Sequence, residues 1–110
     1  METRIEVKDN LIVVRVVGRL VASSAEDVKK VLTEQVAKCP NILCDLSGMT
    51  HIDSSGLGVL VCTLQACKTA GGTCRIACLQ PHPRIVFDIT KVFRVFDIYD
   101  TVEAAEKAFA

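Results

Sequence analysis

Strand-like and helix-like stretches alternate along almost the whole of this chain, and that order limits the folds open to it. Residues 5–7 and 11–17 are rich in β-branched residues and flank a turn at Asp9-Asn10, which predicts an antiparallel hairpin. From residue 25 onward, apolar residues at helical spacing alternate with short apolar runs. A helix that crosses over a sheet usually joins parallel strands. We therefore predict an α/β fold with a mixed central sheet of four to five strands, an N-terminal antiparallel hairpin and four flanking helices.

The elements expected after the hairpin alternate regularly between helix and strand. Ser23-Ser24 is predicted to cap the first helix, and residues 47–53 are predicted to form a loop between a buried strand and the second helix. The second helix presents an apolar face from Leu57 to Cys67 and stops at Gly71-Gly72. The other expected elements are a first helix over 25–38, strands over 41–46, 73–79 and 95–98, a short helix over 83–90, and a terminal helix capped by Asp100-Thr101.

Length and composition favour one globular domain over residues 1–110. Half of the residues are hydrophobic and 24% are charged, which argues against disorder. Thirteen basic and thirteen acidic residues cancel, so no net charge attracts nucleic acid or an anionic membrane. The polar first residues lead directly into the hairpin without an apolar signal segment. We therefore expect a soluble cytoplasmic protein with no nucleic-acid or membrane partner.

The six cysteines are expected to be reduced, mostly buried and structural. No Cys-x-x-Cys pair occurs, and two histidines cannot complete the usual zinc knuckles, so we expect no metal and no cofactor. An apolar core of this size does not require disulfides. A redox sensor built on Cys74 and Cys78 is the alternative that this spacing leaves open.

Polar residues interrupt the buried elements at the turn Asp53-Ser54-Ser55-Gly56. A hydroxyl at the start of a helix can act as an N-cap. The same position, with free backbone N–H groups and the positive end of the helix dipole, also tolerates a phosphate. Ser54 and Ser55 are therefore either capping residues or functional ones.

This turn and its surroundings resemble the STAS domain family, and within it the bacterial anti-sigma factor antagonists. The resemblance covers the length and the element order of the whole chain, and its most specific part is the Asp-Ser-Ser-Gly-Leu-Gly core. The matching segments are residues 42–60, Val17-Gly18-Arg19-Leu20 and Ala70-Gly71-Gly72.

The resemblance implies a small domain that binds a partner protein and has no catalytic residues of its own. In the antagonists, the partner is an anti-sigma factor that is also a serine kinase. It phosphorylates the serine directly after the aspartate, here Ser54, and the phosphorylated form is released; a metal-dependent serine phosphatase then restores the free hydroxyl. The chain would thereby regulate transcription indirectly.

The partner-binding residues implied by this resemblance lie on two loops. Ser55 has a mainly structural role, and Asp53 either contacts the kinase or stabilises the helix dipole. Many antagonists carry an acidic residue after the Val-Gly-Arg-Leu segment, where this chain has Val21. The expected partner-binding set is Asp53, Ser54, Ser55, Gly56, Leu57, Gly58, Val21 and Ser23.

Two other functions remain open from the sequence. A STAS subunit of a different signalling or lipid-transport assembly would use the same face without a phosphorylation cycle. An enzyme would need Ser54 or Ser55 as nucleophile and His51 or His82 as base, but the Gly-x-Ser-x-Gly elbow is absent because Ile52 stands two residues before Ser54. We therefore expect a binding module and not an enzyme.

Overall fold

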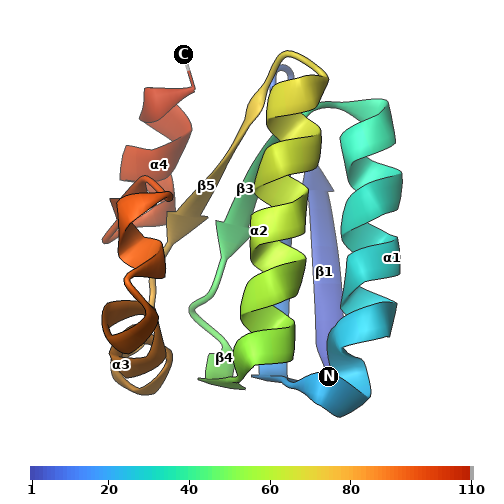
Figure 1. Ribbon diagram of the computed structural model, residues 1–110. Helices are drawn as coiled ribbons and strands as arrows, with labels where there is room; N and C mark the ends of the chain where they lie inside the picture. The colour runs from blue at the N-terminus through green and yellow to red at the C-terminus, as the bar shows by residue number, and fades with distance from the viewer. Residues whose placement is uncertain (110) are drawn as a thin grey trace.

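The opening hairpin forms one edge of a central sheet in the computed structural model, which describes residues 1–109 (Figure 1). Five strands follow the order β1-β2-β3-β5-β6, and β4 pairs with β2. β1 runs antiparallel to β2, and the other pairings are parallel. The strands are β1 (Glu2–Val7), β2 (Ile12–Leu20), β3 (Asn41–Asp45), β4 (Met49–Ile52), β5 (Thr73–Ala77) and β6 (Ile98–Tyr99). The helices are α1 (Ala22–Lys38), α2 (Ser54–Thr69), α3 (Pro81–Thr90), the 3-10 turn η1 (Val92–Arg94) and α4 (Val102–Ala108).

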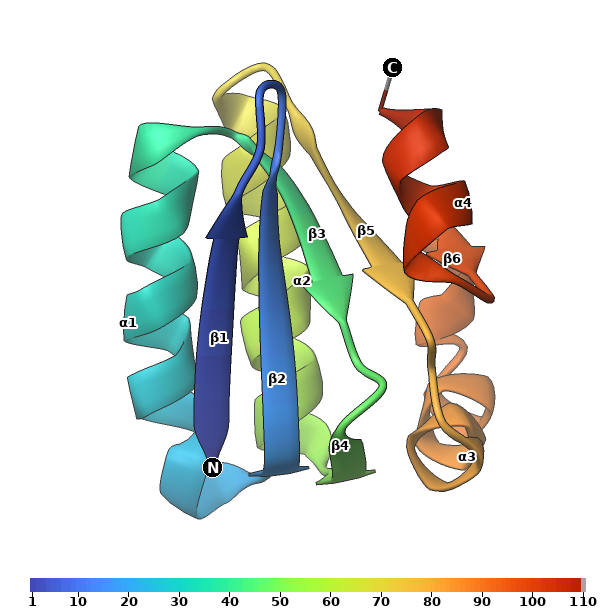
Figure 2. The same ribbon diagram turned by 180° about the vertical axis from the view of Figure 1, so that it is seen from behind.

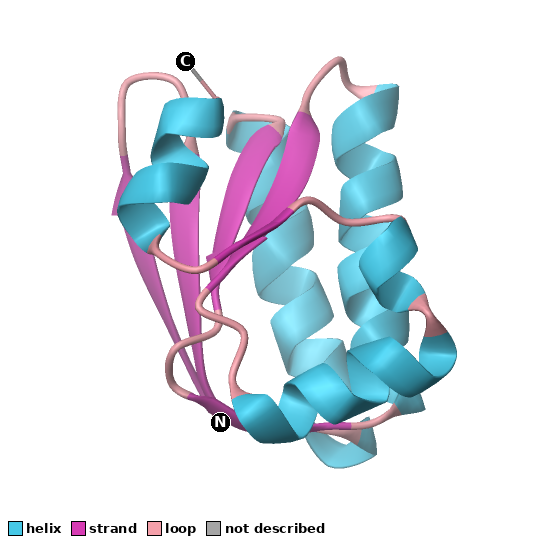
Figure 3. Ribbon diagram, turned by 90° about the vertical axis from the view of Figure 1, so that its left-hand side faces the viewer, coloured by secondary structure: helices cyan, strands magenta, loops and turns pink. Residues whose placement is uncertain are grey.

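The sheet lies between two layers of helices. α1 and α2 pack on one face, and α4 lies on the opposite face, as the two opposed views show (Figure 2). A view along the layers shows the strands between these helices (Figure 3). The predicted fold class, an α/β domain with a mixed sheet and an antiparallel hairpin, is confirmed.

Each face of the sheet carries its own apolar cluster. Ile12 and Val14 of β2 point toward α1 and α2, whereas Val13 points toward α4, because successive side chains of a strand alternate between faces. β3 is covered on both faces: Cys44 belongs to the first cluster and Leu43 to the second. Burial on both faces explains why the sequence of β3 is continuously apolar.

Strand β4 lies where the sequence predicted a loop. Met49 and Ile52 are buried and anchor it, but Thr50 and His51 between them are exposed, so four residues carry no clear strand signal. β4 pairs with the last residues of β2, from Gly18 to Leu20, which extend beyond the shorter β3. Tertiary pairing, and not local propensity, makes this segment a strand.

The start of α1 also differs from the prediction. The helix begins at Ala22 with Val21 as its N-cap residue, so Ser23-Ser24 lies inside the first turn. The Ser24 hydroxyl instead accepts the Val21 N–H at 3.1 Å and lies 2.7 Å from the Arg19 carbonyl oxygen, to which it donates. The predicted cap was therefore placed too late along the chain.

The C-terminal elements are partly as predicted. The last strand is β6 at Ile98–Tyr99 and not residues 95–98, because the chain is still turning at Val95, whose N–H donates to the Val92 carbonyl of η1 at 3.0 Å. α3 starts at Pro81, a residue well suited to the first helical position. The predicted cap of α4 is confirmed at Thr101, whose hydroxyl accepts the Ala104 N–H at 3.1 Å.

The six cysteines are all free in the described structure. Cys44, Cys67 and Cys74 are buried, and burial raises the pKa of Cys67 to about 11, which keeps this thiol protonated. Cys62 is exposed on α2, so the predicted burial holds for only part of the set. Within residues 1–109, no helix has the length and apolar character needed to cross a bilayer.

Candidate functional site

The polar turn lies where β4 ends and α2 begins, beside the end of β2. The Asp53 N–H donates to the Leu20 carbonyl at 3.3 Å, which joins the turn to β2. The buried side chain of Ile52 precedes it, and that of Leu57 follows one turn into α2. The turn is therefore held at both ends by the core.

Asp53 connects the starts of two helices. Its Oδ1 accepts the Gly56 N–H at 3.0 Å and so caps α2, while its Oδ2 accepts the Ala22 N–H at 3.0 Å at the start of α1. The hydrogen bond from Gly56 is the main cause that lowers the pKa of Asp53, and that from Ala22 adds to it. Asp53 thus remains an anion and fixes the β2–α1 and β4–α2 loops against each other.

The N-cap of α2 is Asp53, so the prediction that Ser54 or Ser55 caps this helix is wrong. Ser54 and Ser55 are the first two residues of α2, and neither is its N-cap. Both side chains are exposed. Within the described residues neither hydroxyl makes a hydrogen bond inside the domain. The Ser54 hydroxyl is accordingly available to a visiting protein.

The two glycines of the turn have opposite surroundings. A Cβ on Gly56 would lie 2.3 Å from the Leu20 carbonyl oxygen and 2.8 Å from Cγ1 of Ile52, so only glycine lets α2 approach β2 this closely. A Cβ on Gly58 would meet no atom of the described structure within 4 Å. Gly56 therefore has to be glycine because of its contacts inside the domain, whereas Gly58 faces open space.

The eight residues expected at a partner interface fall into two groups. Gly56 and Leu57 are buried and support the turn without reaching the surface. The other six are exposed or half-buried, and the Asp53–Ala22 hydrogen bond brings Val21 and the first turn of α1 next to the Asp53 turn. The exposed or half-buried residues are Asp53, Ser54, Ser55, Gly58, Val21 and Ser23.

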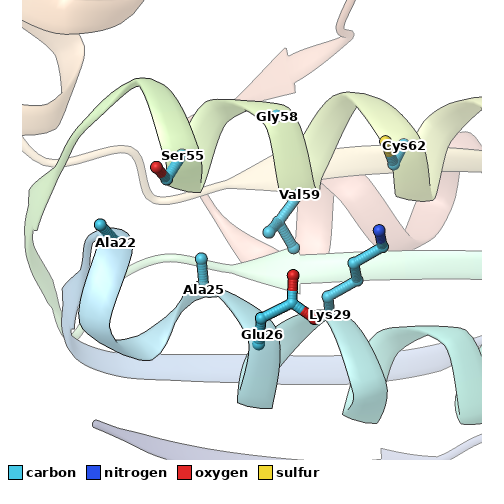
Figure 4. Close-up of a pocket in the computed structure, with 8 residues that line it drawn as sticks. All are labelled: Ala22, Ala25, Glu26, Lys29, Ser55, Gly58, Val59 and Cys62. Atoms are coloured by element: carbon cyan, nitrogen blue, oxygen red, sulfur yellow. The ribbon is translucent and has the colours of Figure 1, made fainter.

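A shallow groove of about 250 Å³ runs between α1 and α2 from this turn (Figure 4). Ser55 lies at one end of it, and the side chains of Glu26 and Lys29 line its α1 wall. The residues of α1 that line this groove are not among the site residues predicted from the sequence. Their spacing at positions 22, 25, 26 and 29 marks one helix face, but nothing in the sequence says that this face borders α2. The lining residues are Ala22, Ala25, Glu26, Lys29, Ser55, Gly58, Val59 and Cys62.

The two histidines lie next to each other. The rings of His51 on β4 and His82 on α3 are 4.5 Å apart between centroids. The hydrogen bond recorded for His51 joins its Nδ1 to Thr50 Oγ1 at 3.0 Å. Among the described residues, neither histidine hydrogen-bonds to Ser54 or Ser55, so the nucleophile–base pair of a serine enzyme is not formed.

Comparisons with known proteins agree on one family. The family model described as "STAS domain" matches residues 2–105. The anti-sigma-B factor antagonist of Bacillus subtilis is 29% identical over 100 residues, covering 89% of this chain and 92% of that protein. The crystal structure of an anti-sigma factor antagonist from Mycobacterium paratuberculosis is 26% identical, with a TM-score of 0.89, over 98% of this chain and 92% of that one.

The fold also matches the Bacillus protein SpoIIAA in two chemical states. Its unphosphorylated form gives a TM-score of 0.83 at 18% identity, over 97% of this chain and 95% of that one. Its phosphorylated form gives a TM-score of 0.76 at 19% identity, over 99% and 100%. At this level of identity the likeness establishes the shared fold.

Proposed function

Because this chain belongs to the STAS domain family, we propose that it is an anti-sigma factor antagonist controlled by phosphorylation of Ser54. The unphosphorylated protein binds an anti-sigma factor that is also a serine kinase, and phosphorylation releases it. A metal-dependent serine phosphatase restores the binding form. The chain is in this proposal a cytoplasmic binding module and the substrate of an enzyme.

One observation supports the proposal most directly: the Ser54 hydroxyl is exposed on a turn that hydrogen bonds hold in place. Ser54 is the first residue of α2, its side chain is exposed, and the backbone around it is held by both oxygens of Asp53. A kinase can therefore reach the hydroxyl without unfolding the domain. The relatives named as antagonists support the choice of an anti-sigma factor as partner.

The added negative charge explains how a phosphate on Ser54 would affect the domain. Phosphorylation adds about 1.5 to 2 negative charges to a serine. Placed beside the Asp53 carboxylate, a phosphate makes this part of the surface strongly acidic, while the N-terminus of α2 offers its dipole and N–H groups inside the domain. The fold therefore survives the modification.

The same phosphate would be costly at an interface packed on the turn. A buried charge without a basic partner costs several kcal/mol, and a loss of about 4 kcal/mol weakens binding roughly a thousandfold. Release requires no change of fold, because the charge is added at the contact itself.

Val21 favours a second candidate function. Its half-buried apolar side chain stands next to the Asp53 turn, at the position where many antagonists have a carboxylate. A STAS subunit of another signalling or lipid-transport assembly would bind through the same face without phosphorylation. The following experiment separates the two functions.

The test is incubation of the purified chain with ATP and a cognate anti-sigma factor kinase, followed by mass spectrometry of the peptide that contains the turn. We expect one phosphate on wild-type protein and on Ser55→Ala, and none on Ser54→Ala. Ser55→Ala is a matched control because its side chain is the neighbouring exposed serine. Unmodified wild-type protein, under conditions that modify a control antagonist, would favour the second candidate.

A further inference from the structure

β1 is the outer strand of the sheet, with β2 beside it on one side (Figure 2). Among residues 1–109, no strand pairs with its other edge. Ile5 and Val7 are 43% and 71% exposed on this edge, so the domain covers their side chains only in part. An open edge with apolar side chains is a site where another strand can add.

The hydrogen-bond pattern of the hairpin tells which backbone groups are free. The Lys8 N–H donates to the Leu11 carbonyl at 2.9 Å, so this pair is a hydrogen-bonded one. Bonded and non-bonded pairs alternate along antiparallel strands, and the register therefore turns the backbone groups of residues 2, 4 and 6 toward β2. The N–H and C=O groups of Thr3, Ile5 and Val7 point away from the domain.

Along β1, the residues whose backbone groups face β2 have side chains of alternating charge. Glu2, Arg4, Glu6 and Lys8 lie on one face of the strand, opposite in sign at each step. They already form ion pairs along the strand, Arg4–Glu2 at 3.4 Å and Lys8–Glu6 at 3.7 Å, and such exposed pairs rearrange at little cost. Lys8 also pairs with Glu106 of α4 at 2.8 Å, and a glutamate of a second copy would share this lysine.

This pattern is complementary to itself when the strand is reversed. If β1 pairs antiparallel with β1 of a second copy so that Ile5 faces Ile5, then Glu2 faces Lys8 and Arg4 faces Glu6 across the junction. The same register places Thr3 opposite Val7, so every outward N–H and C=O of these odd-numbered residues meets a partner. This register thus satisfies charge pairing and backbone pairing together.

The two neighbouring registers are disfavoured by charge. With Arg4 facing Arg4, Glu2 would face Glu6; with Glu6 facing Glu6, Arg4 would face Lys8. Like charges directly opposite each other destabilise a strand pair, whereas opposite charges stabilise it. Registers centred on Thr3 or Val7 keep opposite charges together but form only one kind of pair, Glu2–Arg4 or Glu6–Lys8, whereas the register centred on Ile5 forms two. The sign sequence therefore favours the Ile5 register, with a strand of the sequence of β1 itself as the occupant.

We propose that this chain forms a symmetric homodimer by antiparallel pairing of β1 with β1, centred on Ile5. The two sheets join into one continuous sheet, and Ile5 and Val7 lose their exposure. The interface is one strand wide, so the dimer is reversible and depends on protein concentration.

Cysteine cross-linking tests the register. In a Cys62→Ser background, which removes the exposed thiol, Ile5→Cys places two thiols across a bonded pair with a Cα separation of about 5.5 Å, within disulfide range. Val7→Cys is the matched control: its side chain is more exposed, but the two copies of residue 7 lie roughly 14 Å apart along the strands. We expect covalent dimer from Ile5→Cys and little from Val7→Cys under mild oxidant. Equal cross-linking of both variants, or more from Val7→Cys, would overturn the proposed register.

Sedimentation equilibrium tests the charges. Arg4→Glu places a glutamate opposite Glu6 on both sides of the junction and should raise the dissociation constant about tenfold or more. The double variant Arg4→Glu/Glu6→Arg restores opposite signs and should restore the wild-type constant. Wild-type protein that stays monomeric at the highest soluble concentration would overturn the proposed dimer. A double variant whose dissociation constant is no lower than that of Arg4→Glu would also overturn it. Circular dichroism of each variant checks that the fold is kept.

Discussion

At the scale of single residues, the candidate site depends on one close approach between backbones. Gly56 lies against the Leu20 carbonyl, and its missing side chain lets α2 start beside the end of β2. Gly58, two residues later, faces open space. The same residue type therefore has two different roles within one helical turn.

Substitution by alanine should separate these roles. Gly56→Ala forces a methyl group into backbone atoms and should lower the free energy of unfolding by roughly 1–3 kcal/mol or more. Gly58→Ala has room for its methyl group and should raise stability by about 0.5–1 kcal/mol, because alanine favours a helix more than glycine does. Urea unfolding of both variants measures the difference. Equal effects would show that the close contact at Gly56 is relieved by a shift of α2.

At the scale of elements, Asp53 holds two helices in place with one carboxylate. One oxygen caps α2, and the other accepts a hydrogen bond from the first residue of α1. The loop after β2 and the turn after β4 therefore move as one unit. A partner that binds the turn meets both loops in a fixed arrangement.

The carboxylate should make stability depend on pH. Its hydrogen bonds lower the pKa of Asp53 in the folded state, so the stabilisation is complete above the unfolded value of about 4 and is lost as the pH falls through the folded value. Wild type should therefore be more stable than Asp53→Asn at neutral pH, and the difference should shrink in acid. Thermal unfolding of both proteins between neutral pH and pH 3 measures this change.

The control for this experiment is Asp27→Asn, which alters another carboxylate close to the start of α1. The Asp27 side chain is exposed, so its replacement should leave the unfolding midpoint nearly unchanged at neutral pH. A difference between wild type and Asp53→Asn that stays constant down to pH 3 would argue against an ionised cap.

At the scale of the whole molecule, the proposed switch acts without refolding. Gly56 and Leu57 are buried beneath the turn, whereas Ser54 is exposed on its outer side. The core beneath the turn is continuous with the cluster under α1 and α2. A charge added at Ser54 therefore changes the surface and leaves the packing intact.

Variants of Ser54 should change binding and leave the fold unchanged. Ser54→Ala should bind the anti-sigma factor and resist release in the presence of ATP, whereas Ser54→Asp should bind at least about tenfold more weakly because of its added charge. Titration calorimetry with the partner measures both affinities, and the unfolding midpoints check the fold. Equal affinities of the two variants would contradict exclusion by charge.

Much of this protein follows from local patterns in its sequence. β-branched runs, helical spacing and the turn at Asp9-Asn10 determine the order of hairpin, strands and helices. The Asp-Ser-Ser-Gly turn marks the start of α2 and the family resemblance. These features depend on residues close together along the chain, whose spacing alone carries the information.

The tertiary structure decided the rest, because the deciding contacts join residues far apart in the sequence. β4 exists because the end of β2 extends past β3, and the Ala22 N–H at the start of α1 donates to Asp53, which lies 31 residues further along the chain. The need for glycine at position 56 arises from the Leu20 carbonyl. Local propensity cannot encode such contacts, since each forms only when packing of the core brings the two segments together.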